Sequence, residues 1–167
     1  SLRALGLTRE DFVVRLSSRN AWHDFFERGV RNAECGTPAA LGGTEREYAF
    51  YQAIDKLERE DAAESDRKLR ALGFSLEAVK GFIAAGEPTA ELATILGDLA
   101  ARGLGEFVKI DYGVIRGLAY YTGPVFEAFD VKGEFRAIAG GGRYDGLVKL
   151  VSGGKVDLPG LGFGMGD

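Results

Sequence analysis

The residues best suited to chemistry lie in two short stretches of the second half of the chain. Residues 116–123 read Arg-Gly-Leu-Ala-Tyr-Tyr-Thr-Gly, and residues 140–145 read Gly-Gly-Gly-Arg-Tyr-Asp. An arginine carries five donors in a rigid fork and suits a carboxylate or a phosphate. Tyrosines provide flat apolar walls with a polar tip, and glycines let a ligand approach the main chain closely. Together these residues predict a pocket for a small, polar, partly anionic ligand.

Each of these residues also has a purely structural interpretation. Arg116 could be a surface or ion-paired arginine, the tyrosines half-buried sheet residues, and the glycines turn residues. Neither glycine cluster fits a nucleotide-binding motif. Residues 140–142 lack the Lys-Ser/Thr ending of a phosphate loop, and Gly162, Gly164 and Gly166 have no helix after them. The order and combination of the two stretches favour a binding pocket.

Metal and nucleophile chemistry find little support in the sequence. Cys35 is the only cysteine and His23 the only histidine, so the chain has no Cys/His set for zinc. A single histidine and a single cysteine also support no Ser/His/Asp or Cys/His nucleophile arrangement. We expect both residues to be structural, and we expect no bound metal.

Composition narrows the class of protein. Apolar residues make up 46% of 167 residues, enough for a globular core, and no run approaches the length of a membrane span. The sequence shows no export signal, so we expect a cytoplasmic protein without membrane contact. Lys and Arg number 21 against 25 Asp and Glu, which argues against a free-standing nucleic-acid-binding domain.

The first hundred residues read as one strand followed by helices. Residues 12–16 are rich in β-formers and predict a short strand, and from Trp22 onward the apolar spacing is helical. Thr44 with Glu47 has the spacing of a capping box, and Ser75 and Thr89 are suited to cap two further helices.

After Gly103 the apolar period changes to two. Residues 125–131 and 134–139 predict a tight antiparallel hairpin around Lys132-Gly133. Glu127 falls on an apolar face of this hairpin and therefore needs a partner. Residues 161–167 begin a strand with so few side chains that its backbone must pass close to another group.

These elements predict an α+β fold. An incomplete antiparallel sheet carries the pocket, and a helical lobe is inserted between its strands. We divide the chain into residues 1–18, a strand and its flanks; residues 19–102, the helical lobe; and residues 103–167, the β segment with the pocket.

Three stretches resemble known signatures of one family. Residues 116–127 resemble the first histidine-specific signature of histidyl-tRNA synthetases, residues 139–145 resemble the second, and residues 161–166 look like the opening of the third class II synthetase motif. Residues 12–19 resemble the strand that follows the second class II motif. The signatures occur in the order of the family, so the resemblance covers the whole chain and implies a partial class II catalytic sheet.

The resemblance implies an activity. It implies that L-histidine is activated by ATP, with Mg²⁺, to histidyl-adenylate and then transferred to the 3′ end of tRNA(His), by a protein that is a homodimer at full length. Arg116 would act at the α-phosphate and the amino-acid carboxylate. The histidine side chain would be bordered by aromatic and glycine residues: Tyr120, Tyr121, Tyr144, and the backbone of Gly140, Gly141 and Gly142.

The resemblance leaves other roles open. Arg143 and Glu127 either support the pocket or form a structural ion pair behind it. Many members carry an acidic residue where this sequence has Ala119, which we interpret as a subfamily feature. The first two class II motifs are expected before Ser1, and the arginine of the third motif and the anticodon-binding domain after Asp167. The chain on its own is therefore not expected to charge tRNA.

Two alternative functions remain at this stage. One is a synthetase-like regulatory subunit of the ATP phosphoribosyltransferase of histidine biosynthesis, which would sense histidine without charging tRNA. Such proteins tend to lose catalytic arginines, so Arg116 favours the enzyme. The other treats residues 19–102 as a tRNA-contacting module, although the acidic balance there disfavours strong autonomous RNA binding.

Overall fold

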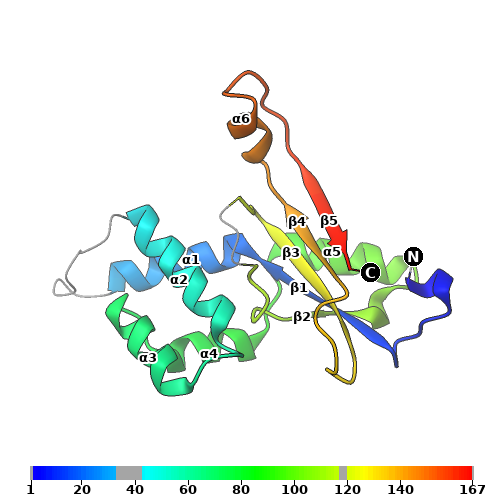
Figure 1. The fold of residues 1–167 in the computed structure, drawn as a ribbon, viewed down its shortest axis with the longest axis horizontal. Helices are drawn as coiled ribbons and strands as arrows, with labels where there is room; N and C mark the ends of the chain where they lie inside the picture. Colours follow the sequence, from blue (N-terminus) through cyan, green and yellow to red (C-terminus); the bar gives the residue numbers. More distant parts are fainter. Residues whose placement is uncertain (1, 33–42, 117–119, 167) are drawn as a thin grey trace.

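A computed structural model describes residues 2–32, 43–116 and 120–166. Its centre is a five-stranded sheet with the strand order β2-β1-β3-β4-β5 (Figure 1). The strands are β1 Phe12–Ser18, β2 Val108–Ile110, β3 Pro124–Asp130, β4 Ala139–Arg143 and β5 Leu161–Met165. The helices are α1 Arg19–Asn32, α2 Gly43–Lys56, α3 Ala62–Ala71, α4 Leu76–Ala85, α5 Ala90–Ala101 and α6 Leu147–Val151, with 3₁₀ turns η1 Leu2–Leu5 and η2 Gly105–Phe107.

The sheet is mixed. β1 pairs antiparallel with β3, and β3–β4 and β4–β5 are antiparallel as predicted. β1 and β2, however, run parallel, with Val14 opposite Val108. Parallel neighbours need a long crossover connection, and the chain supplies one by passing through α1 to α5 between these two strands. The predicted α+β fold with helices inserted between strands is thus confirmed. The prediction of a purely antiparallel sheet is wrong, because β1 and β2 are parallel.

The helices begin largely where the capping residues predict. Ser75 Oγ accepts from the amide of Ala78, and Thr89 Oγ1 accepts from the amide of Leu92. The capping box is wrong, because Thr44 lies inside the first turn of α2, which starts at Gly43. Glu47 instead bonds side chains of α1 and α2.

Helices α1 to α4 pack around an aromatic core. Trp22 is fully buried, and its indole Nε1 donates to the carbonyl of Tyr112 over 3.1 Å. Its ring lies edge-on to Phe50 and Phe82, at 5.7 and 4.7 Å between centroids. Burial of such rings, together with edge-to-face contact, is a main source of stability in a small core. Trp22 is therefore a core residue of these helices.

Helix α5 has a different position. It packs against β1 and η2, and in Figure 1 it lies behind the sheet while α1 to α4 gather to one side. Ile95 and Leu99 of α5 share an apolar hollow with Phe126 and Phe163 of the sheet. Helices α1 to α4 therefore lie together beside the sheet, whereas α5 covers one of its faces. No helix in the described part of the chain is long and apolar enough to span a membrane.

The predicted hairpin exists with a wider loop. β3 and β4 are antiparallel, but β4 begins only at Ala139, so residues 134–138 are not the second strand. The Asp130 carboxylate accepts from the amides of Glu134 (2.9 Å) and Phe135 (3.1 Å) and draws the chain into a loop. This side-chain turn competes successfully with strand pairing.

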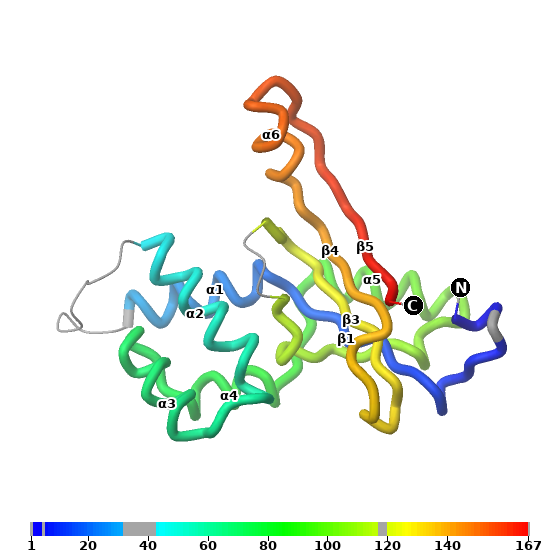
Figure 2. Tube along the Cα trace, in the orientation of Figure 1, coloured from blue at the N-terminus to red at the C-terminus, as the bar shows by residue number. Residues whose placement is uncertain are grey.

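The end of the chain forms a projecting arm. Figure 2 shows β4, α6 and β5 rising away from the rest of the molecule. The strand predicted to begin at residue 161 is present as β5, which lies at the edge of the sheet. Three of its side chains, Leu161, Phe163 and Met165, are more than half exposed.

Candidate functional site

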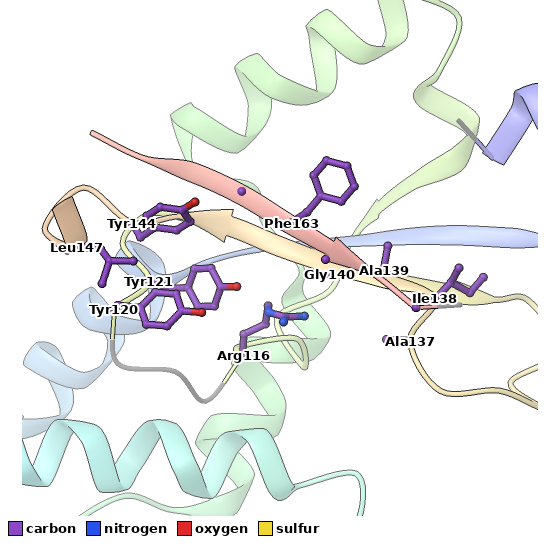
Figure 3. Close-up of a pocket in the computed structure, with 13 residues that line it drawn as sticks. Arg116, Tyr120, Tyr121, Ala137, Ile138, Ala139, Gly140, Tyr144, Leu147 and Phe163 are labelled. Carbon is purple, nitrogen blue, oxygen red and sulfur yellow. The ribbon is translucent and has the colours of Figure 1, made fainter. Parts of the chain in front are cut away.

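The two signature stretches meet at one hollow of about 600 Å³, which lies between β4, β5, α6 and the residues Arg116, Tyr120 and Tyr121 (Figure 3). The residues lining it are Arg116, Tyr120, Tyr121, Ala137, Ile138, Ala139, Gly140, Tyr144, Leu147, Gly162, Phe163, Gly164 and Gly166. Its volume is in the range of small-molecule pockets. Arg116 and the three predicted tyrosines thus share one cavity.

Arg116 is held in an unusual way. Its φ of +52° is left-handed, a conformation that costs a non-glycine residue energy and that clusters at functional sites. Nη1 donates to Oε1 of Glu127 over 2.7 Å, and Cζ lies 5.6 Å from the ring centroid of Tyr121. Nε is buried and finds no hydrogen-bond partner among the described residues. A buried donor without a partner calls for an explanation, which an acceptor on a ligand would supply.

Glu127 lies on a strand face where a carboxylate needs a partner, and that partner is Arg116. It lies on β3 directly opposite Gly140 of β4. A Cβ on Gly140 would overlap Nη1 of Arg116, so this glycine leaves the space in which the ion pair forms. Burial raises the pKa of Glu127, and the positive charge of Arg116 opposes that rise. The pair holds the guanidinium at the wall of the hollow.

Arg143 does not pair with Glu127. Its Nε donates to Oδ1 of Asp145 over 2.8 Å, and its Nη1 reaches Oε1 of Glu91 on α5 over 3.3 Å. Because Arg143 ends β4 opposite Leu161 while Glu127 faces Gly140, the register keeps the two side chains apart. The ion pair left open between Glu127 and Arg143 is therefore wrong. Arg143 instead ties the strand end to α5.

The three tyrosines form one cluster. The ring centroid of Tyr120 lies 4.7 Å from that of Tyr121 and 5.8 Å from that of Tyr144, and Tyr121 and Tyr144 are 6.3 Å apart. Tyr121 is buried, whereas Tyr120 is partly open to solvent. Figure 3 shows the tyrosines together on one side of the hollow, with Arg116 farther along the same wall.

Backbone bonds fix the segment that carries Tyr121. The amide of Thr122 donates to the carbonyl of Arg143, and Oγ1 of Thr122 accepts from the amide of Asp145. The carbonyl of Gly123 accepts from the amide of Arg19 over 2.8 Å. The segment is thereby tied both to the end of β4 and to the start of α1, which makes Tyr121 a fixed wall.

The glycines of β4 have separate roles. Gly140 lines the hollow, whereas Gly141 and Gly142 do not. A Cβ on Gly142 would come within 2.9 Å of Cδ1 of Tyr121, so this glycine seats the tyrosine ring against β4. Gly141 faces the backbone of β5, where a Cβ would lie 2.7 Å from Cα of Phe163.

Several lining residues were not predicted. Gly162, Ile138, Leu147 and Phe163 border the hollow, although only the glycine-rich strand gave a sequence signal. That strand was expected to pass close to another group, and the group is Tyr144: a Cβ on Gly162 would overlap the Tyr144 hydroxyl. The other three have no distinctive motif and are found only through the fold.

Some sequence predictions concern other positions. Ala119, with Gly117 and Leu118, and Cys35 lie outside the described residues. His23 bonds Glu47 through Nδ1 over 2.7 Å, away from the main hollow. The described ranges contain no group of three or more His, Cys, Asp or Glu side chains arranged to hold a metal ion.

Comparison with solved structures defines the class of fold. Histidyl-tRNA synthetase from Nostoc sp. PCC 7120 superposes with a TM-score of 0.66 over 97% of this chain and 41% of that protein, at 24% identity. A Bacillus halodurans C protein described as an ATP phosphoribosyltransferase regulatory subunit/histidyl-tRNA synthetase gives 0.67 over 98% and 44%, at 20% identity. The fold is that of the class II histidyl-tRNA synthetases.

Sequence comparison then gives the family. The family model for histidyl-tRNA synthetase matches residues 39–166. The histidine–tRNA ligase of Opitutus terrae is 42% identical over 189 residues, covering 99% of this chain and 40% of the relative. The chloroplastic/mitochondrial enzyme of Arabidopsis thaliana is 34% identical, covering 99% and 35%. The chain belongs to the histidyl-tRNA synthetase family and spans about 40% of the length of the bacterial relative.

Proposed function

We propose that this chain is the histidine-binding part of the catalytic region of a histidine–tRNA ligase. The full-length protein would activate L-histidine with ATP to histidyl-adenylate and transfer the histidyl group to tRNA(His). The observation that carries the proposal is the single hollow shared by Arg116 and the three tyrosines. The homodimer and the cytoplasmic location belong to the same proposal.

Arg116 would bind the α-phosphate of ATP and the carboxylate of histidine. Negative charge on the α-phosphate oxygens must be stabilised during in-line attack by the histidine carboxylate. A guanidinium already fixed by Glu127 does this without reorganising, and its unpartnered Nε remains free among the described residues to donate to an oxygen of the ligand. Mg²⁺ would enter the site bound to ATP, as part of that substrate.

The tyrosines would contact the imidazole ring of histidine. Tyr121 is buried and fixed, so its hydroxyl is the better candidate for a hydrogen bond to a ring nitrogen, with Tyr120 and Tyr144 as walls. A site that pairs the imidazole nitrogens rejects analogues that leave its polar groups unpaired. Specificity for histidine would then arise in the binding step.

Calorimetric titration of L-histidine into the full-length protein tests this. Arg116→Ala should weaken binding about tenfold or more, because a charged hydrogen-bond partner is lost, and Tyr121→Phe should weaken it severalfold. Arg70→Ala is the control, because Arg70 lies on α3 and pairs with Asp66 away from the hollow. Unchanged affinity in both pocket variants would refute the proposal.

The regulatory-subunit alternative keeps one supporting observation, the Bacillus halodurans protein whose description names both functions. Both functions require a histidine pocket, so histidine binding does not separate them. Aminoacylation of tRNA(His) by the full-length protein does, and the complete Arg116–Glu127 pair favours a positive result. Histidine binding without any charging would support the regulatory function instead.

A further inference from the structure

A second hollow of about 240 Å³ lies between α1 and α2, next to the first. It is bordered by Arg19, Asn20 and His23 of α1, by Thr44, Glu47, Tyr48 and Tyr51 of α2, and by Tyr121 and Thr122. Tyr121 lines both hollows, so its ring is a shared wall. None of the other residues of the second hollow lines the first.

Arg19 is the unusual group in this hollow. Only 6% of the residue is exposed, and its Cζ lies 3.7 Å from the ring centroid of Tyr51. Its Nη1 is buried without a hydrogen-bond partner among the described residues. A buried guanidinium without a counter-charge is costly, and stacking on an aromatic face offsets only part of that cost.

Glu47, the carboxylate that lines this hollow, already has other partners. Oε1 of Glu47 accepts a hydrogen bond from the hydroxyl of Tyr51 and lies 2.7 Å from Nδ1 of His23. Arg19 also begins α1, a helix of 14 residues, so the positive end of the helix dipole adds to its charge. Glu47 and Asp55 act on Arg19 through space, but among the described residues no carboxylate forms an ion pair with its guanidinium. An acceptor on a ligand could therefore bond the buried Nη1.

We propose that this second hollow binds a phosphate group, with Arg19 and the amino end of α1 supplying the positive charge. Asn20 and Thr44 contribute side-chain donors from two helices. Donors that come from several directions suit the oxygens of a tetrahedral phosphate better than the two coplanar oxygens of a carboxylate. The group belongs either to free phosphate or to a phosphodiester in a nucleotide chain. The site is independent of histidine activation.

His23 provides a local probe, because it is the only histidine of the chain and lines the hollow. The test titrates inorganic phosphate, and separately a single-stranded RNA trinucleotide, into the chain carrying Arg116→Ala, and follows the imidazole NMR signals of His23. The Arg116→Ala background removes the guanidinium of the first hollow. A saturable shift of the His23 signals with either ligand is expected, and the ligand that binds more tightly identifies the source of the phosphate.

Two variants locate the site. Arg19→Gln should weaken binding about tenfold or more, the loss expected for a hydrogen bond to a charged group. Asn20→Asp should also weaken it, because it adds negative charge to the hollow while an acidic residue in the first turn favours the helix. Gln52→Glu makes the same charge change on α2 outside the hollow and should leave binding unchanged. Absence of saturable shifts with both ligands, or equal affinity in Asn20→Asp and Gln52→Glu, would overturn the proposal.

Discussion

At the scale of single residues, Gly140 decides whether Arg116 can reach Glu127. The two charged residues lie 11 positions apart in sequence and are joined by a bond of 2.7 Å. The space for that bond exists only because β4 carries no side chain opposite Glu127. Residues 140–142 first suggested that a ligand approaches the main chain closely. Gly140 also leaves the space for Arg116, the side chain that would contact the ligand.

Gly140→Ala should therefore displace Arg116. We expect histidine affinity of the full-length protein to fall about tenfold and stability to fall by about 1–3 kcal/mol, the usual cost of overpacking. Isothermal calorimetry and denaturant unfolding measure the two effects. Gly146→Ala is the matched control, because a Cβ at that position would have open space. Wild-type affinity in Gly140→Ala would contradict this role of the glycine.

His23 gives a prediction that depends on pH. Its bond to Glu47 raises the pKa of His23 above the usual value for histidine, with Glu27 and Asp24 acting in the same direction. A pKa raised by folding means that the protonated form stabilises the folded state. This stabilisation is complete below the pKa of the unfolded chain and is lost as pH rises through the folded pKa.

The loss of stability in His23→Gln should accordingly be larger near about pH 6 than near about pH 9. Thermal unfolding of wild type and variant at both pH values measures it. Because His23 is half exposed, the effect should be small. A difference that grows toward high pH would show that the histidine acts in another way.

At the scale of elements, the starts of α4 and α5 were the most predictable features and the loops the least. Ser75 and Thr89 act within three residues of their own positions, so the sequence contains the whole interaction. The start of β4 depended on Asp130, whose carboxylate captures two later amides and delays the strand. A strand propensity over residues 134–138 does not reveal that competition.

Thr89→Ala tests the cap of α5. It should cost about 1 kcal/mol, because the amide of Leu92 loses its side-chain acceptor. Thr94→Ala is the control: Thr94 is exposed on the same helix and bonds only the carbonyl of Ala90, so its replacement should be neutral or slightly stabilising. Chemical denaturation of both variants decides the matter, and equal costs would argue against the cap.

At the scale of the whole molecule, the site depends on contacts between distant parts of the chain. Arg116 is bonded to Glu127 of β3, Thr122 to the end of β4, and Gly123 to the start of α1. The sequence motifs predicted that Arg116 and the three tyrosines would line one pocket, because the motifs resemble the histidine-specific signatures of the family. Sequence could not predict that Arg116 would pair with Glu127 or that Arg143 would turn to α5, because those choices follow from strand register.

The extent of the chain gives a prediction about activity. The chain spans about 40% of the bacterial relative, and the proposed reaction also needs contacts to ATP and tRNA beyond those of the histidine hollow. We expect no histidine-dependent ATP–pyrophosphate exchange from the chain alone and clear exchange from the full-length protein. Exchange by the isolated chain would show that the described elements suffice for activation.

The most direct measurement of the central proposal is a crystal structure of the full-length protein with L-histidine. We predict that the imidazole lies among Tyr120, Tyr121 and Tyr144, with Tyr121 within hydrogen-bond distance of a ring nitrogen, and that the carboxylate lies on the side of Arg116. Histidine bound outside this hollow, or in it with its carboxylate turned away from Arg116, would contradict the account.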